Sequence, residues 1–190
     1  HPSCHSNSIY SIPSSVTSIG DYAFSYCSNL TSITIPSSVA SIGNKVFEKC
    51  EKLKFINVES GNSAFVSIDG ILFSKDMQTL ICHPSCHSNS IYNIPPSVTS
   101  IGDYAFYECR NLASITIPSS VTSIGDYAFY ECTNLTSITI LSSVVSIGNS
   151  AFFNCRKITT IFSSFGYNSI SPYLYNFSRP KIQLILAPEY

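Results

Sequence analysis

One short segment of the sequence gathers residue types that bind metal ions. Thiol and imidazole donors crowd into positions 82–87, at a spacing that could hold zinc. The four candidate ligands are Cys82, His83, Cys86 and His87. The first ten residues, which include His1, Cys4 and His5, are identical to residues 83–92. Because a duplication copies its residues whether or not they have a function, we expect no metal ligands here, with zinc as the alternative.

The cysteines follow a second pattern. Five of the eight share one position of a repeat: Cys27, Cys50, Cys109, Cys132 and Cys155. A shared position favours a row of small, buried thiols that face the core. Neighbouring thiols could come within disulfide range. The last three form a run, however, so pairing would leave one of them out. We therefore expect all eight thiols to be free, with at least one disulfide as the alternative.

The sequence contains no recognisable catalytic arrangement. The nucleophile motif G-x-S-x-G is absent, and all four histidines lie in the duplicated segment. No phosphate-binding glycine motif is present either. Four carboxylates recur at repeat positions, which indicates cap and surface roles: Asp103, Glu108, Asp126 and Glu131. We predict a protein that is not an enzyme and needs no cofactor.

Composition excludes further classes of protein. The chain has 190 residues, of which 44% are hydrophobic and 11% are charged, and its net charge is −1. Without a basic patch it is not expected to bind nucleic acid. Its apolar runs fall short of the ~20 residues that a membrane helix needs. Since the first residue is His1 and no signal peptide is visible, we expect a mature chain or a fragment of a longer array.

Internal repeats decide the predicted architecture. The pattern Val-x-Ser-Ile-Gly begins at five positions, and copies within a block lie 23 residues apart: Val16, Val39, Val98, Val121 and Val144. In each unit, alternation places Ile33 and Ile35 on the inner face of a strand and Ser32 and Thr34 on the outer face. Stacked units would pair these strands in parallel at about 4.8 Å.

The rest of the unit is predicted from its turn and cap residues. A short second strand carries Val39 and Ile42, and Gly43 permits a sharp corner. Asp21, Asp103 and Asp126 stand where an N-cap would precede one or two helical or 3₁₀ turns. Asp69-Gly70 lies between two apolar runs, which predicts a β-hairpin that bulges from the solenoid.

The pattern L-x-x-I-x-I-P-x-x-V-x-x-I-G-x-x-A-F-x-x-C resembles the BspA-type leucine-rich repeats and covers nearly the whole chain. The expected fold class is α/β: a β-rich, right-handed leucine-rich-repeat solenoid with a parallel concave sheet and one inserted β-hairpin. We expect one domain, 1–190. It comprises repeats over 1–56, an irregular long coil with the hairpin over 57–95, repeats over 96–163 and a degenerate C-terminal cap over 164–190.

The outer side of the long strands is the candidate binding face. Phe55 and Phe162 interrupt an otherwise small and polar surface, and exposed aromatic residues are favoured as binding anchors. The complete candidate set is Ser32, Thr34, Phe55, Asn57, Ser114, Thr116, Ser137, Thr139, Thr160 and Phe162.

The family resemblance implies a cell-surface or secreted protein that adheres to host matrix protein, cells or glycans. We accordingly expect an extracellular protein or glycan as the partner and a monomeric chain. The main alternative is a structural spacer with no ligand of its own, its hydroxyls simply solvated. A threonine ladder that binds ice or another crystal is a more remote alternative, since only Thr34, Thr116 and Thr139 share a phase.

Overall fold

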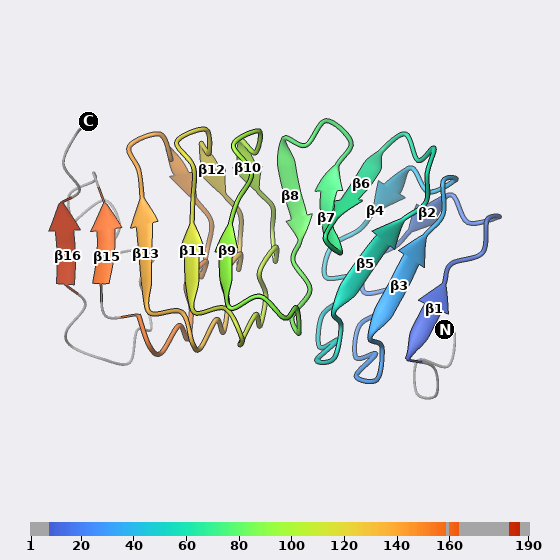
Figure 1. Ribbon diagram of the computed structural model, residues 1–190, viewed down its shortest axis with the longest axis horizontal. Coiled ribbons are helices and arrows are strands. Elements are labelled where there is room, and N and C mark those ends of the chain that lie inside the picture. The colour runs from blue at the N-terminus through green and yellow to red at the C-terminus, as the bar shows by residue number, and fades with distance from the viewer. Residues whose placement is uncertain (1–7, 159, 164–182, 187–190) are drawn as a thin grey trace.

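The computed structural model describes residues 8–158, 160–163 and 183–186, and the side chains of residues 8–158 (Figure 1). Its coils stack along one axis, and each contributes one long strand to a first row of parallel strands. These strands are β1 (Ile9–Ser11), β3 (Ser32–Ile35), β5 (Phe55–Val58), β9 (Ile91–Asn93), β11 (Ser114–Thr116), β13 (Ser137–Ile140), β15 (Thr160–Ser163) and β16 (Gln183–Leu186). The predicted solenoid of stacked repeats is confirmed.

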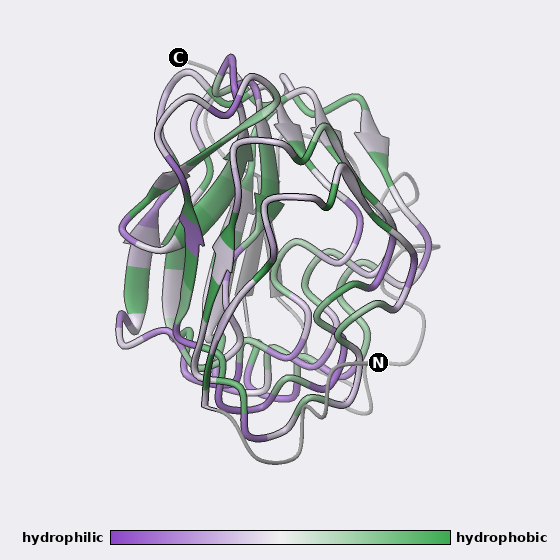
Figure 2. Cartoon of the chain, turned by 90° about the vertical axis from the view of Figure 1, so that its right-hand side faces the viewer, coloured by the Kyte–Doolittle hydropathy of each residue, from purple (hydrophilic) through white to green (hydrophobic). Residues whose placement is uncertain are grey.

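A second row contains one short strand per regular coil. Its members are β2 (Ser18–Ile19), β4 (Ser41–Ile42), β10 (Ser100–Ile101), β12 (Ser123–Ile124) and β14 (Ser146–Ile147). Except between β5 and β9 and between β4 and β10, neighbours in both rows pair in the predicted phase, as in Ser18 with Ser41 and Ser32 with Phe55. Figure 2 looks along the long axis and shows the coils enclosing a common interior.

A row of turns, here called the turn ladder, follows the second strands. It comprises residues 20–27, 43–50, 102–109, 125–132 and 148–155. The prediction of helical turns in this region was wrong, because no helix occurs among the described residues. Tyr22 and Tyr26 have φ of 58° and 60°, and a left-handed residue at every fourth position interrupts an α-helix.

Hydrogen bonding between coils explains this choice of turns. Backbone N–H groups alternate in direction: Ser25 donates to Tyr22 O within the same turn, whereas Phe24 donates across to Val46 O, both at 3.0 Å. A helix would direct all of these donors along its own axis and leave the next coil without partners. The turn ladder therefore connects neighbouring coils by hydrogen bonds along the solenoid.

The predicted N-cap aspartates also form hydrogen bonds between neighbouring coils. Asp21 Oδ1 accepts the backbone N–H of Asn44 in the next coil at 2.6 Å, and Asp126 Oδ1 accepts that of Asn149 at 2.6 Å. The neighbouring glycine is required by this close approach, since a Cβ on Gly43 would lie 2.5 Å from the backbone nitrogen of Asp21. The φ of Gly43 is not positive, so the sharp corner expected here does not explain the glycine. Gly43 is needed because a side chain would collide with Asp21.

The long coil departs from the repeat as predicted and contains a hairpin of β6 (Phe65–Ile68) and β7 (Ile71–Ser74), followed by β8 (Thr79–Cys82). Asp69 and Gly70 form its tight turn, both with positive φ. The hairpin also interrupts the solenoid, because β5 and β9 are not paired and the long strands form two sheets, β1–β3–β5 and β9–β11–β13–β15–β16. It therefore separates a first block of coils from a second.

The core is divided at the same place. One cluster of buried residues belongs to the first block and a larger one to the second. Strand β7 lies between them: Leu72 packs in the first cluster, while Ile71 and Phe73 pack in the second. All three are at most 1% exposed, so β7 is buried on both faces and does not bulge from the solenoid as the sequence suggested. In the part of the chain described here, no helix has the length and hydrophobicity to cross a membrane.

Candidate functional site

The predicted binding residues fall into two groups on the long strands, whose outer side is here called the long-strand face. Ser32, Thr34, Phe55 and Asn57 adjoin one another in the first sheet, and Asn57 Nδ2 donates to Ser32 Oγ at 3.1 Å. The second sheet holds the other six: Ser114, Thr116, Ser137, Thr139, Thr160 and Phe162. Thr160 and Phe162 pair with β13 through their backbones, but their side chains lie outside the described set. The hairpin turn keeps the two groups apart.

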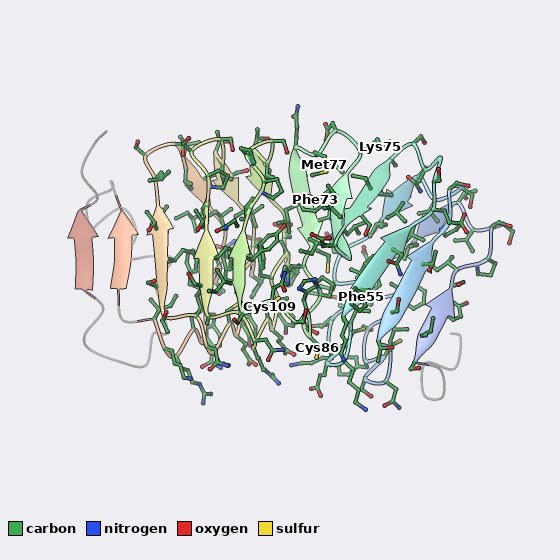
Figure 3. All side chains as sticks on the ribbon, viewed as in Figure 1. Phe55, Phe73, Lys75, Met77, Cys86 and Cys109 are labelled. Atoms are coloured by element: carbon green, nitrogen blue, oxygen red, sulfur yellow. The ribbon has the colours of Figure 1, made fainter. Side chains whose placement is uncertain are left out.

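Phe55 is fixed in position by that hairpin turn (Figure 3). Ile56 N–H donates to Gly70 O at 2.9 Å, and a Cβ on Gly70 would lie 2.7 Å from Phe55 Cδ1. The ring also contacts His87 in a T-shaped arrangement, with centroids 6.2 Å apart. Phe55 nevertheless remains 46% exposed. Phe55 is therefore a half-exposed aromatic ring that its neighbours hold in position among hydroxyl groups. A partner could contact this ring with little loss of side-chain entropy.

Sequence reasoning missed three exposed aliphatic residues near this face. Ile9 and Ile91 are 67% and 66% exposed, and they pair with Ser32 and Ser114 respectively. Ile68, just before the hairpin turn, is also exposed. The sequence could have predicted the exposure of Ile9 and Ile91. Tyr10 aligns with the inward-facing Ile33, so Ile9, the residue before it, must point outward, and Ile91 before Tyr92 repeats this arrangement.

The Cys-His segment does not converge on a metal. His87 Nε2 lies 2.9 Å from Asp69 O, and His83 Nδ1 lies 3.1 Å from Pro84 O, so protein groups occupy these nitrogens. Among the described residues, no three His, Cys, Asp or Glu side chains are grouped to hold an ion. Burial lowers the pKa of His83 to about 3, which keeps its imidazole neutral.

The repeat-phase cysteines are buried, as predicted, and their thiols join neighbouring coils. Cys132 Sγ donates to Phe106 O at 3.1 Å, and Cys155 Sγ donates to Phe129 O at 3.0 Å. Burial raises the pKa of Cys50 to about 12, so its thiol stays protonated and unreactive. The expectation of eight free thiols was wrong at Cys27, which is disulfide-bonded. Within residues 8–158, the free thiols are Cys50, Cys82, Cys86, Cys109, Cys132 and Cys155.

One carboxylate assigned to the surface is instead buried. Glu108 is 4% exposed and pairs with Lys49, which reaches it from the other side of the junction between the blocks. Arg110 Nη2 lies 3.6 Å from the same carboxylate. The hydrogen bond to Glu108 raises the pKa of Lys49. This ion pair ties the two blocks together at the turn ladder.

Replacing Lys49 by methionine is expected to lower the free energy of unfolding by about 1–2 kcal/mol, because Glu108 stays buried with only Arg110 nearby. The double variant Lys49→Met/Glu108→Gln should lose less than the sum of the two single variants. Urea denaturation of all four proteins measures this coupling, with Lys54→Met as an exposed-lysine control. Strictly additive losses would mean that the pair contributes nothing.

Parallel strands stacked in 23-residue coils around a shared core define a leucine-rich-repeat solenoid. The chain belongs to the BspA type leucine-rich-repeat family: the family model matches six copies over residues 2–85 and 81–189. Proteins with this fold typically act as non-catalytic repeat scaffolds. No curated protein matches the chain.

Solved structures show the same architecture. A leucine-rich repeat protein from Eubacterium ventriosum is 25% identical, with a TM-score of 0.60 over 85% of this chain and 61% of that structure. The pneumococcal vaccine antigen PcpA is also 25% identical, with a TM-score of 0.65 over 82% of this chain and 50% of that structure. The chain thus spans between half and two thirds of the length of these two relatives.

Proposed function

We propose that this chain is a non-catalytic binding module of a cell-surface or secreted protein, and that it adheres to an extracellular protein or glycan through its long-strand face. The observation that carries the proposal is Phe55, which is held by the hairpin and still 46% exposed. The neighbouring Asn57 and Ser32 supply hydrogen-bonding groups beside it. Membership of a repeat family and the likeness to the pneumococcal vaccine antigen PcpA support the same role.

The composition of this face sets the expected strength of binding. One fixed aromatic ring among hydroxyls suits an interface of micromolar affinity, which needs about 8 kcal/mol. Because the net charge is −1, long-range steering is weak and binding should depend little on salt. We expect the chain to bind as a monomer.

The first experiment screens the immobilised chain against matrix proteins and glycans, and then tests two variants on any ligand found. Phe55→Ser should weaken binding about 30-fold, the effect of losing a binding hot spot of 2 kcal/mol. Ser114→Glu/Ser137→Glu should abolish binding without unfolding the solenoid, because it places two adjacent charges on the second sheet. The matched control is Ser18→Glu/Ser41→Glu, on exposed serines that pair in the short-strand row.

Adhesion that survives both changes on the long-strand face would rule that face out. A chain that binds nothing in the screen would favour the structural spacer.

A further inference from the structure

The hydrogen bonds of the turn ladder are interrupted between the two blocks. In the regular coils, alternate N–H groups of one turn donate to the next turn: Tyr22 N–H donates to Asn44 O and Phe24 N–H to Val46 O, both at 3.0 Å. The later turns of the ladder bond to one another in the same way. The long coil has a hairpin in place of a turn, so a gap remains between the last turn of the first block and the first turn of the second.

The turn 43–50 presents unpaired main-chain donors to this gap. The N–H groups of Lys45 and Phe47 correspond to those of Tyr22 and Phe24 one coil earlier, so they point along the solenoid towards the second block. In the part of the chain that the structure describes, neither N–H group has a hydrogen-bond acceptor. Both donors are therefore available to a ligand in the gap.

The strand before this turn has an open edge as well. Among the described strands, β4 pairs only with β2. Ile42 O accordingly has no donor within the described residues, whereas the equivalent Ile19 O accepts Gly43 N–H at 2.8 Å. Ile42 O, Lys45 N–H and Phe47 N–H thus form one acceptor followed by two donors. Elsewhere in the molecule, the main chain of the next coil satisfies these same groups.

The opposite wall of the gap shows that a main chain can bind there. Asp103 O has no donor among the residues described, although the equivalent Asp126 O accepts Tyr104 N–H at 2.9 Å. Two residues further on, Ala105 O accepts His83 N–H at 2.7 Å. His83 belongs to the hairpin coil, so a peptide segment from outside the turn ladder already supplies one of the missing hydrogen bonds. The remaining groups are left for another segment.

A cavity of about 210 Å³ lies between the two walls, with lining residues from both the turn 43–50 and the turn 102–109. Leu53, Leu72 and Ile81 give it an apolar part. An apolar cavity of about 150 Å³ is large enough to bind benzene, so this one has room for an aliphatic side chain. Charged side chains of both signs also line the cavity, which does not favour a simple anion.

We propose that the gap binds a peptide segment of a partner protein. Its main chain donates to Ile42 O and accepts the N–H groups of Lys45 and Phe47, and one aliphatic side chain packs against Leu72 and Ile81. A peptide fits because its N–H and C=O groups recur at the spacing that neighbouring coils already use, as when a peptide adds to the open edge of a sheet. The site is separate from the long-strand face and does not depend on adhesion through it.

The test is a titration of the ¹⁵N-labelled chain with the capped peptide Ser-Gly-Leu-Gly-Ser, followed at the amides of Lys45 and Phe47. In the free chain these two amides should exchange with solvent much faster than that of Phe24, because they lack acceptors. The peptide should bind saturably, with a dissociation constant of about 1 mM, and should slow their exchange.

Two control peptides separate main-chain pairing from burial of the side chain. The same peptide N-methylated at Leu and at the second Gly cannot donate from these positions and should bind about tenfold more weakly. Replacing Leu by Gly removes the aliphatic group and should also weaken binding about tenfold. Equal binding of the N-methylated peptide would overturn the proposal, as would slow exchange of the Lys45 and Phe47 amides in the free chain.

Two variants of the protein locate the binding. Ile81→Phe fills the cavity and should abolish peptide binding, whereas Ile147→Phe, at a half-buried isoleucine of the second block, should leave it unchanged. The proposal also fails if the unmodified peptide does not bind the unaltered chain, or if a folded Ile81→Phe variant binds it as before.

Discussion

Replacing Phe129 by alanine is expected to lower the free energy of unfolding by about 3–5 kcal/mol. Its ring stacks between Phe106 and Phe152, with centroid distances of 4.9 and 5.3 Å, and all three side chains are fully buried. Truncation removes the middle member of this stack and leaves a cavity that neighbouring coils cannot close, because their own hydrogen bonds fix the spacing. Urea denaturation followed by circular dichroism measures the loss.

The control for Phe129 is Val145→Ala, since Val145 is 80% exposed and should cost less than about 0.5 kcal/mol. The assignment of inward and outward positions would be wrong if both variants unfolded at the same urea concentration.

Replacing Asn62 by alanine is expected to cost about 3 kcal/mol or more, although the residue is neither apolar nor part of the repeat pattern. Its Nδ2 donates to Pro36 O and Val39 O, both at 2.9 Å. Its Oδ1 accepts the N–H groups of Ala64 and Phe65, both at 2.8 Å. Asn62 is 1% exposed. Its loss therefore leaves four backbone groups without hydrogen-bond partners where the chain enters the hairpin.

Asn93→Ala is the matched control, because Asn93 is exposed at the end of a long strand. It should change the unfolding free energy by less than about 0.5 kcal/mol. Thermal and urea unfolding of the two variants compare them directly. An Asn62→Ala protein as stable as Asn93→Ala would show that water satisfies the four backbone groups.

The repeat itself was readable from the sequence, since a strand face depends only on alternation. Ile33, Ile35 and Ile138 are buried as their phase requires, and Asp69-Gly70 forms the predicted turn. These features are local, so residue type and spacing suffice to predict them.

The features that were missed depend on neighbouring coils. The turn around Tyr22 resembles a helix start when one unit is considered alone, but alternate N–H groups of this turn donate to the next coil. The burial of Glu108 was also missed, because its ion-pair partner Lys49 lies on the other side of the junction and is distant in sequence. The gap in the turn ladder arises because a hairpin replaces a turn, and nothing in the residues of either flanking turn signals it.

The position of β7 has a consequence for how such arrays change length. Since Leu72 packs into one cluster while Ile71 and Phe73 pack into the other, this strand separates the apolar cores of the two sets of coils, which polar contacts such as Lys49–Glu108 also connect. Insertion or deletion of a whole 23-residue unit on one side therefore leaves the contacts on the other side unaltered. The hairpin coil acts as a fixed boundary between two independently extensible stacks, so genetic duplication can lengthen either stack without requiring compensating substitutions in the other.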